Sequence, residues 1–205
     1  MLDHTTMRLR AIIFLFGFVA IARATSVQPP SFPELVAGAD GIYRGHVTAV
    51  QARRIEAPGG NSIIKTFVTF NVERALKGAA KTEVVLEFLG GQVGDDILEV
   101  SGVPKFAVGD REILFVQGNG KQFCPLVAVM HGRYRVAHDE ATGRDYVARE
   151  NRQPLRDASE VVLPMDGLPA ALQRAASGAS GLTPEAFESL IATEVTTPTA
   201  PKQLP

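Results

Sequence analysis

Histidine and cysteine, two residue types that often carry catalysis, are few and widely spaced in this chain. Beyond position 24, histidine occurs only at His46, His131 and His138. His131, Asp110 and Ser101 are the types that a hydrolytic site uses, although no Gly-x-Ser-x-Gly turn accompanies the serine. They would act together only if folding brought them together. A hydrolase assembled in the fold is therefore an alternative hypothesis and not the leading one.

The sequence has no recognisable metal or cofactor motif. Neither His-Glu-x-x-His nor Cys-x-x-Cys spacing occurs. His131 and His138 would bind a metal only if they lay close together with a further ligand, so a metal-handling periplasmic protein is a second alternative. Gly118-Asn119-Gly120-Lys121 lacks the spacing and the Ser or Thr of a phosphate loop. We predict no cofactor, and we assign no catalytic or metal-binding residue.

Cys124 is the only cysteine, so the chain can form no internal disulfide. It lies in an apolar run between Phe123 and Leu126, and free cysteines are frequently buried. We expect Cys124 to be buried. Pairing with a second chain and a role as a nucleophile are less favoured alternatives.

Residues 1–24 have the features of a secretory signal peptide. Arg8 and Arg10 precede a run of twelve mainly apolar residues, 11–22, and the segment ends in the small-residue motif Ala22-Arg23-Ala24. A membrane-spanning helix needs about twenty residues, so this run is too short to be one. We predict an exported mature chain that begins near Thr25, in the periplasm or outside the cell, with no membrane span.

The charge of the mature chain argues against nucleic-acid binding. Removal of residues 1–24 leaves 18 basic and 21 acidic residues, a formal charge of −3, whether synthesis starts at Met1 or at Met7. Arg53-Arg54 and Arg133-x-Arg135 are pairs and not patches, whereas nucleic-acid binding needs a basic stripe. We predict no nucleic-acid partner and expect any partner to be an exported or envelope protein.

Alternation of apolar and polar residues predicts six or seven short strands. The clearest is 64–76, in which Ile64, Thr66, Val68, Phe70, Val72 and Leu76 share one face. Others are expected at 43–49, 83–88, 123–129, 133–136 and 146–148. The apolar run 113–116 is typical of a strand buried on both faces. Gly118-Asn119-Gly120 predicts a hairpin turn between that run and 123–129.

A short helix is expected on each side of this strand-rich part. Ser31 is a suitable N-cap for a helix over 33–37, with Glu34 near its start. Thr183 is a suitable N-cap for a second helix. The apolar stripe of the second helix consists of Phe187, Leu190, Ile191 and Val195.

These signals divide the chain into a signal peptide (1–24), a β-barrel domain (25–149), an irregular linker (150–182), a C-terminal helix (183–195) and a disordered tail (196–205). The composition of 176–181 is that of a flexible linker. We therefore expect the C-terminal helix to be appended to the barrel, and the barrel to stay folded without it.

Short strands, glycine turns and the lack of alternating helices predict a mainly β fold. At this size we expect a small antiparallel OB-like barrel, because closure removes exposed strand edges. A short N-terminal helix and the appended C-terminal helix complete the predicted architecture.

Four segments resemble a loosely defined group of exported bacterial proteins. They are 39–47 (ADGIYRGHV), 70–78 (FNVERALKG), the Gly90-Gly91 pair and 104–115 (PKFAVGDREILF). The order of elements is more distantly similar to the netrin-like, OB-type barrel of metalloproteinase inhibitors. Those inhibitors chelate the zinc of their target through an N-terminal cysteine, which this chain lacks. The resemblance implies a barrel, with Phe106 and Phe115 in its core, and implies no activity.

The leading functional prediction is a non-catalytic exported binding or accessory module. OB-type barrels bind through one strand face and the adjoining loops. Here this region would be the glycine-rich segment 90–104 and the exposed positions around it. The candidate binding-surface residues are Arg44, Phe67, Gly90, Gly91, Asp95 and Asp96. Phe67 is included because it is an aromatic residue on the otherwise polar face of its strand.

Overall fold

The computed structural model describes residues 29–56, 59–163 and 181–197. The predicted signal peptide, the segment 164–180 of the predicted linker and most of the predicted tail lie outside these ranges. The predictions made for those parts of the chain stay predictions.

Six antiparallel strands form one sheet in the order β3-β2-β1-β6-β7-β8. The strands are β1 (Gly41–Glu56), β2 (Ser62–Lys77), β3 (Glu83–Leu89), β6 (Arg111–Val116), β7 (Arg133–Asp139) and β8 (Arg144–Arg149). A separate hairpin consists of β4 (Gly91–Val93) and β5 (Asp96–Leu98). The helices are α2 (Phe32–Gly38) and α4 (Pro184–Thr196), with short 3-10 helices η1 (Val129–Gly132) and η2 (Ala158–Val162). The mainly β prediction is confirmed.

The predicted barrel does not close. The outer strands of the sheet, β3 and β8, do not pair with each other. Their edges are covered by other segments instead. The Asn119 side chain accepts a hydrogen bond from Glu87 N at 3.0 Å and donates one to Val85 O at 2.8 Å. On β8, Val147 N donates to Leu182 O at 2.8 Å. These loop contacts protect the strand edges that barrel closure was expected to remove.

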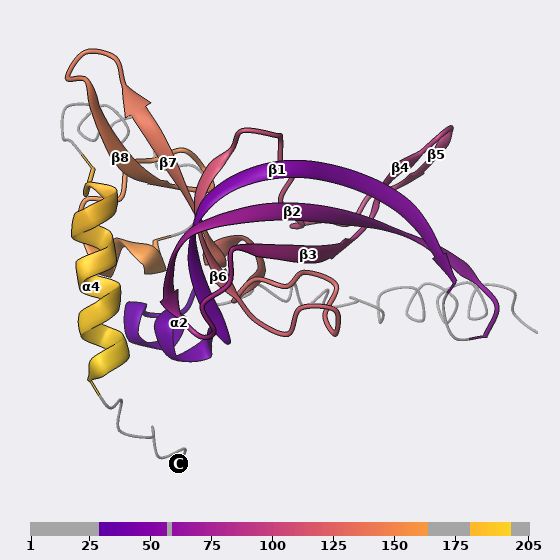
Figure 1. Cartoon of the computed structure of the whole chain (residues 1–205), viewed down its shortest axis with the longest axis horizontal. Helices are drawn as coiled ribbons and strands as arrows, with labels where there is room; N and C mark the ends of the chain where they lie inside the picture. The colour runs from indigo at the N-terminus through magenta and orange to yellow at the C-terminus, as the bar shows by residue number, and fades with distance from the viewer. Residues whose placement is uncertain (1–28, 57–58, 164–180, 198–205) are drawn as a thin grey trace, which may run out of the picture.

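Strands β1 and β2 form a long arch that extends away from the helices (Figure 1). Their pairing changes register at three places, one of them between Val47 and Ala49. There β1 contains one more residue than β2, so the side-chain alternation of β1 shifts by one position. As a result, Tyr43 before this bulge and Val50 after it lie on the same face of the sheet.

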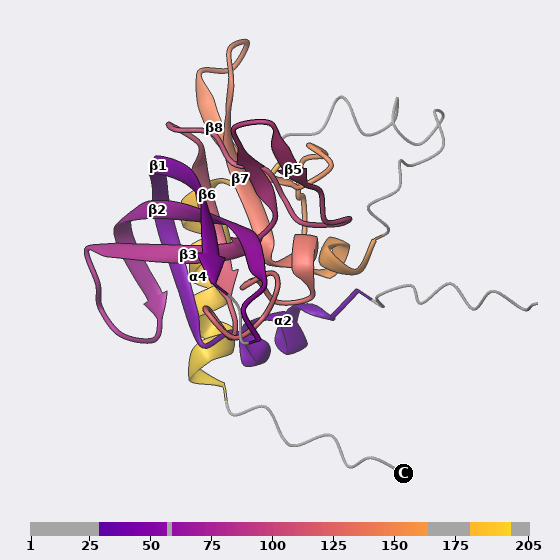
Figure 2. The same cartoon turned by 90° about the vertical axis from the view of Figure 1, so that its right-hand side faces the viewer.

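The sheet buries apolar side chains on both faces, as β6 shows most clearly. All four residues from 113 to 116 are buried, which confirms the prediction for this run. Ile113 and Phe115 pack against α2, α4 and η2, on what we call the helix face. Leu114 and Val116 belong to a second cluster on the opposite side, which we call the cleft face. Figures 1 and 2 show α2 and α4 side by side against the sheet.

Both helices have the N-cap residue that the sequence predicts, and α2 extends one residue beyond the predicted range 33–37 at each end. The Glu34 carboxylate accepts hydrogen bonds from the backbone N and the hydroxyl of Ser31, at 2.9 and 2.8 Å, at the start of α2. At the start of α4, the Thr183 hydroxyl accepts a hydrogen bond from Ala186 N at 3.2 Å. Each cap satisfies N–H groups that a first helical turn otherwise leaves unpaired.

Helix α4 is part of the core and is not appended to it. Phe187 and Ile191 are completely buried in the same cluster as Phe32 of α2 and Tyr134 of β7. The ring of Phe187 lies 5.0 Å from that of Tyr134 and 5.8 Å from that of Phe32, between ring centroids. The rest of the predicted stripe is exposed. Residues 150–163 of the predicted linker contain η2 and add two buried residues to this cluster, Leu155 and Val161.

The segment 123–129 was predicted as a strand and does not form one. It makes one isolated β-bridge to the sheet, between Leu126 and Val116, and its Phe123 O accepts a hydrogen bond from Leu89 N at the end of β3. Pro125 has no N–H to donate, and Ala128 and Val129 have left-handed φ values of 46° and 59°. The chain therefore turns into η1, and β6 pairs with β7 instead.

Candidate binding cleft

A cleft of about 980 Å³ lies on the cleft face of β1, β2 and β3. The β4–β5 hairpin and the segment that follows it form its other walls. The lining residues are Val50, Ala52, Thr66, Val68, 88–92 and 97–106. Much of the glycine-rich segment that the sequence indicated as a binding region therefore surrounds this space.

Two glycines allow the chain to turn from β3 into the hairpin across β1 and β2. Gly90 and Gly91 have φ values of 101° and 133°, which side-chain-bearing residues rarely adopt. A Cβ atom at Gly91 would lie 2.4 Å from Thr66 Oγ1 and 3.0 Å from Ala52 Cβ. The Thr66 hydroxyl also donates a hydrogen bond to Gly90 O at 2.7 Å. The predicted site residues Gly90 and Gly91 thus build the cleft through their backbone.

The cleft has an apolar floor and a rim without a dominant charge. Val50, Val68 and Phe88 provide the floor, from three adjacent strands. At the rim, Lys105 Nζ lies 3.3 Å from Glu99 Oε1, and both side chains are largely exposed. Sites for small molecules are typically concave and mostly apolar, with a few polar groups. This lining suits an apolar ligand without a charge of its own.

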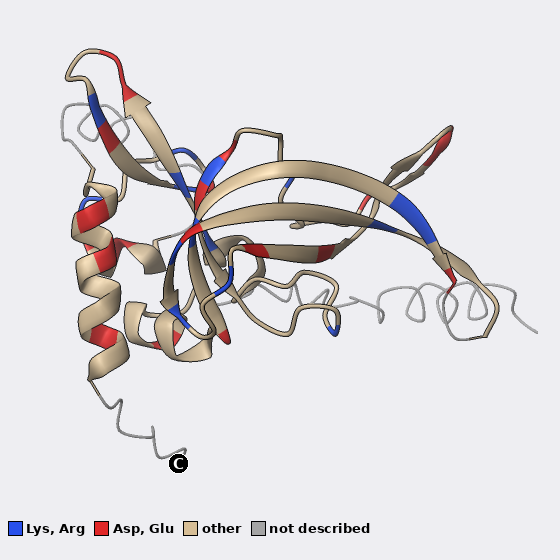
Figure 3. Ribbon diagram, viewed as in Figure 1, with Lys and Arg blue, Asp and Glu red and all other residues tan. Residues whose placement is uncertain are grey.

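Four of the six predicted binding-surface residues do not line the cleft, and two of them, Phe67 and Arg44, lie well away from it on other contacts. Phe67 is half-buried on the opposite face of β2 from Thr66 and Val68, and the Arg53 guanidinium lies 5.3 Å from its ring centroid. Arg44 contacts helix α4: its Nη1 atom lies 2.9 Å from Glu185 Oε1 and 2.8 Å from Glu188 Oε1. The acidic residues of α4 that include this pair are visible in Figure 3.

The other two predicted residues lie at the tip of the hairpin. Asp95 is exposed in the turn between β4 and β5. Asp96 forms an ion pair with Arg54 of β1, and this contact ties the hairpin to the arch. Asp96 therefore contributes to the position of one cleft wall, while neither aspartate lines the cleft.

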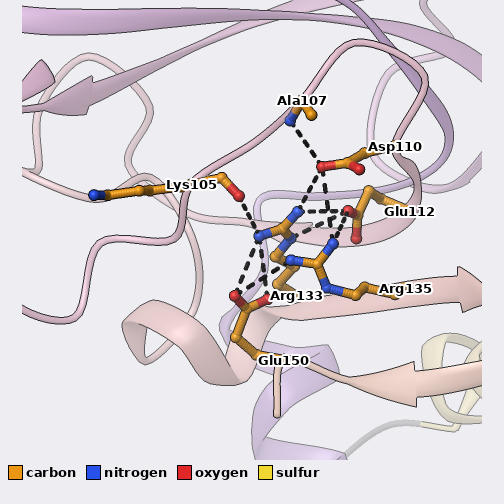
Figure 4. A network of polar contacts seen from close by, with 7 residues as sticks. All are labelled: Lys105, Ala107, Asp110, Glu112, Arg133, Arg135 and Glu150. Carbon is orange, nitrogen blue, oxygen red and sulfur yellow. Dashed lines mark hydrogen bonds and ion pairs between the residues drawn. The ribbon is translucent and has the colours of Figure 1, made fainter. Parts of the chain in front are cut away.

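A polar cluster that the sequence did not predict lies on the same face of the sheet. It comprises Asp110, Glu112, Arg133, Arg135 and Glu150, and we call it the Arg133 cluster (Figure 4). Arg133 and Glu112 are completely buried. Arg133 Nη2 lies 2.6 Å from Glu112 Oε1 and 3.1 Å from Asp110 Oδ2, and Arg133 Nη1 lies 3.2 Å from Glu150.

The Arg133 cluster supports one wall of the cleft. Arg133 Nη1 donates a hydrogen bond to Lys105 O at 2.8 Å, and its guanidinium lies 4.0 Å from the ring centroid of Phe106. The Phe106 ring is in turn 5.1 Å from that of Phe88, between centroids. A buried cation stacked on a ring adds a favourable interaction to the packing. Arg133 therefore fixes the position of two lining residues, Lys105 and Phe106.

Burial strongly affects the ionisation of Glu112. Loss of solvation raises the pKa of this carboxyl to about 7, although the nearby Arg133 acts in the opposite direction. Its second oxygen, Oε2, is buried and has no hydrogen-bond partner among the described residues. An ionised carboxylate would leave a charged oxygen unsatisfied there, which also favours the protonated form.

The residues of the hydrolase alternative are not joined by hydrogen bonds within the described ranges. Asp110 Oδ2 accepts hydrogen bonds from Ala107 N at 2.8 Å and from Arg133. His131 is buried, its Nδ1 atom has no partner in the described part of the chain, and burial lowers its pKa. Ser101 lines the cleft. The three residues thus have separate surroundings.

The metal alternative gains no support from the described residues. His138 contacts Asp145 in the β7–β8 hairpin, with Nδ1 2.9 Å from Oδ1, and this contact raises the His138 pKa. Across residues 29–56, 59–163 and 181–197, no group of three or more His, Cys, Asp or Glu side chains is placed to hold a metal ion. Cys124 is buried as predicted, and burial raises its pKa to about 11.

Comparison with protein-family models, with curated proteins and with solved structures finds no significant match to this chain. None of the helices in the described part of the chain has the length and hydropathy that crossing a membrane requires.

Proposed function

We propose that this protein is an exported, non-catalytic binding module that holds a neutral, apolar ligand in the cleft. The observation that carries the proposal is a space of about 980 Å³ with an apolar floor, whose rim charges, Lys105 and Glu99, lie next to each other. Export to the periplasm or beyond the cell rests on the signal-peptide features of residues 1–24. An exported or envelope protein as partner belongs to the same proposal.

The mode of binding is the one that the OB-like resemblance implies. OB-type folds bind ligands on a strand face and through the adjoining loops. The cleft combines a strand face from β1, β2 and β3 with the hairpin and the loop after it. The sheet of this chain is open and does not close into an OB-type barrel. The relationship to OB-type proteins is therefore part of this proposal.

The expected affinity follows from the apolar area that a small ligand can bury. A ligand that buries about 300 Å² of apolar surface gains roughly 7 kcal/mol at about 25 cal/mol per Å². Loss of translational and rotational freedom offsets part of this gain. We therefore expect weak binding, with dissociation constants of roughly a millimolar and none tighter than about ten micromolar.

The neutral fluorescent dye N-phenyl-1-naphthylamine is a suitable probe, because its emission rises in apolar surroundings. Two matched variants test the site. Val50 lines the cleft and is 38% exposed, whereas Val85 lies on the opposite face of the sheet and is 41% exposed. We expect the mature chain and Val85→Glu to bind the dye alike. Val50→Glu should bind roughly tenfold or more weakly, because a carboxylate in an apolar site must be desolvated.

Thermal melts followed by circular dichroism show whether both variants are folded. Dye binding that is unchanged in Val50→Glu would place the dye outside the cleft and contradict the proposal. Equal losses of dye affinity in the two folded variants would also contradict the proposal, because Val85 does not line the cleft.

A further inference from the structure

We propose that the Arg133 cluster controls the cleft wall through the charge on Glu112, so that the wall is held in place when Glu112 is protonated and released when it is ionised. This inference concerns regulation of the cleft and, for its effect on ligands, rests on the proposed function. The control of the wall itself can be tested without a ligand.

The Arg133 cluster contains more carboxyl groups than guanidinium groups. Arg133 and Arg135 supply two positive charges, and Asp110, Glu112 and Glu150 supply three carboxyl groups. With Glu112 protonated the cluster is neutral. With Glu112 ionised it carries one excess negative charge, located on a side chain that has no exposed surface.

The groups that face Glu112 from neighbouring elements cannot balance this extra charge. Arg133 is shared with Asp110 and Glu150, and Arg135 Nη1 lies 3.7 Å from Glu112 but 3.8 Å from Asp110. On the other side, the residue of β1 opposite Glu112 is Gly45, which has no side chain. A buried charge without full compensation is costly, and water entry is one way to reduce the cost.

The route for water entry is the wall that Arg133 holds. The contacts of Arg133 with Lys105 O and with the Phe106 ring are the links between the cluster and the cleft. Phe106 is only half-buried and lies in a loop, whereas Glu112 and Arg133 lie on strands. The loop is therefore the element that moves when the buried cluster becomes charged.

The direction of the pH effect follows from linkage. In the closed arrangement burial raises the Glu112 pKa to about 7, while in an opened, hydrated arrangement it would be nearer its usual value. Increasing pH therefore favours the open arrangement. Because only the closed cleft is complete, ligand affinity should decrease as pH rises through neutrality.

The chain contains no tryptophan, so Phe106→Trp creates a single fluorescent reporter in the wall. We expect acrylamide to quench this tryptophan more strongly as pH rises from about 5.5 to about 8.5, with a midpoint near 7. Combining Phe106→Trp with Glu112→Gln should keep quenching low at every pH. Val85→Trp, on the opposite face, should show no transition.

A second variant keeps the test decisive if Glu112→Gln does not fold. Asp110→Asn removes one carboxylate, so the cluster is balanced when Glu112 is ionised. Asp110 is partly exposed, and an asparagine oxygen can still accept the hydrogen bond from Ala107 N. In the Phe106→Trp background, Asp110→Asn should weaken or abolish the pH-dependent transition in acrylamide quenching.

Dye titrations with the otherwise unmodified mature chain complete the test. Affinity for N-phenyl-1-naphthylamine should fall roughly three- to tenfold between about pH 6 and about pH 8, and should stay constant in Glu112→Gln. A quenching profile without a transition near neutrality overturns the control of the wall, even if the dye binds. A clear transition without dye binding at any pH overturns the proposed ligand function and supports the control of the wall.

Discussion

The two faces of the sheet are covered in different ways, and the difference determines where a ligand can bind. On the helix face, α2 and α4 present large side chains, and the rings of Phe32, Phe115, Tyr134 and Phe187 pack together. On the cleft face, β1, β2 and β3 are covered by a short hairpin entered through Gly90 and Gly91, and about 980 Å³ is left open. Helices fill the sheet surface with side chains, whereas a glycine-rich turn leaves space above it.

The largest effect should come from a deletion in the filled face. Phe187→Ala removes a completely buried ring and should lower the free energy of unfolding by about 3–5 kcal/mol. The matched change Phe106→Ala, in the half-buried cleft wall, should cost only about 1–2 kcal/mol. Urea denaturation followed by circular dichroism measures both. Equal losses of unfolding free energy in the two variants would show that the cleft wall is as much a part of the core as α4.

Removal of the C-terminal helix should have a larger effect than the sequence predicts. The sequence predicts a barrel that stays folded without this helix, as in a chain that ends at Ser177. Because α4 contributes Phe187 and Ile191 to the main cluster, we now expect this truncation to lose cooperative unfolding. A sharp thermal transition in the truncated chain would contradict the account of the helix face.

The next effect concerns the pH dependence of stability. Glu112 has a raised pKa in the folded chain, so its contribution to stability is complete below its usual pKa of about 4.5 and is lost as pH rises towards 7. At about 1.4 kcal/mol per pKa unit, this loss amounts to about 3 kcal/mol.

Melting temperatures at about pH 5 and about pH 8 measure this change, and Glu112→Gln should remove most of it. His138→Gln is the control. The contact with Asp145 raises the His138 pKa, so the stability it contributes is also lost as pH rises, but the residue is exposed. A pH dependence that disappears in His138→Gln and persists in Glu112→Gln would assign the titration to the wrong group.

The smallest effect is expected on the side of the arch away from the cleft. Phe67→Ala removes a half-buried ring that contacts Arg53 and should cost about 1 kcal/mol or less. Dye affinity should be unchanged, because Phe67 and the cleft lie on opposite faces of β2. A clear loss of dye binding in a folded Phe67→Ala protein would restore Phe67 as a binding residue.

Local signals predicted much of the fold. Ser31 and Thr183 start the two helices, the apolar run 113–116 is buried on both faces, and Val84, Leu86 and Phe88 alternate inward along β3. Each of these features depends on neighbouring residues in the sequence. Features that depend on distant contacts were missed. The Asn119 side chain covers the edge of β3, and Phe187 packs between Phe32 and Tyr134.

Bulges also limited the prediction of side-chain direction. Val72 and Leu76 were placed on one face of β2, but Val72 packs on the cleft face and Leu76 on the helix face. The pairing of β1 with β2 shifts register between these positions. Such shifts change the alternation and leave no mark in the apolar pattern.

The site was predicted only in part. The glycine-rich segment was identified, because Gly90 and Gly91 mark a change of direction. The Arg133 cluster was not, although a signal for it was present. Arg133 and Arg135 alternate with the apolar residues of β7, and Glu112 directly precedes the buried run of β6. Charged residues at these places are candidates for a buried ionic cluster, and sequence alone does not show which ones meet.

The most direct test of the account is methyl NMR of the mature chain during titration with N-phenyl-1-naphthylamine. We predict saturable shift changes for the methyl groups of Val50, Val68 and Val103, which line the cleft. The methyl groups of Val36 and Ile191, buried on the helix face, should not change. Shift changes centred on the helix face, or none at saturating dye, would contradict the claim that the open side of this sheet is a ligand-binding site.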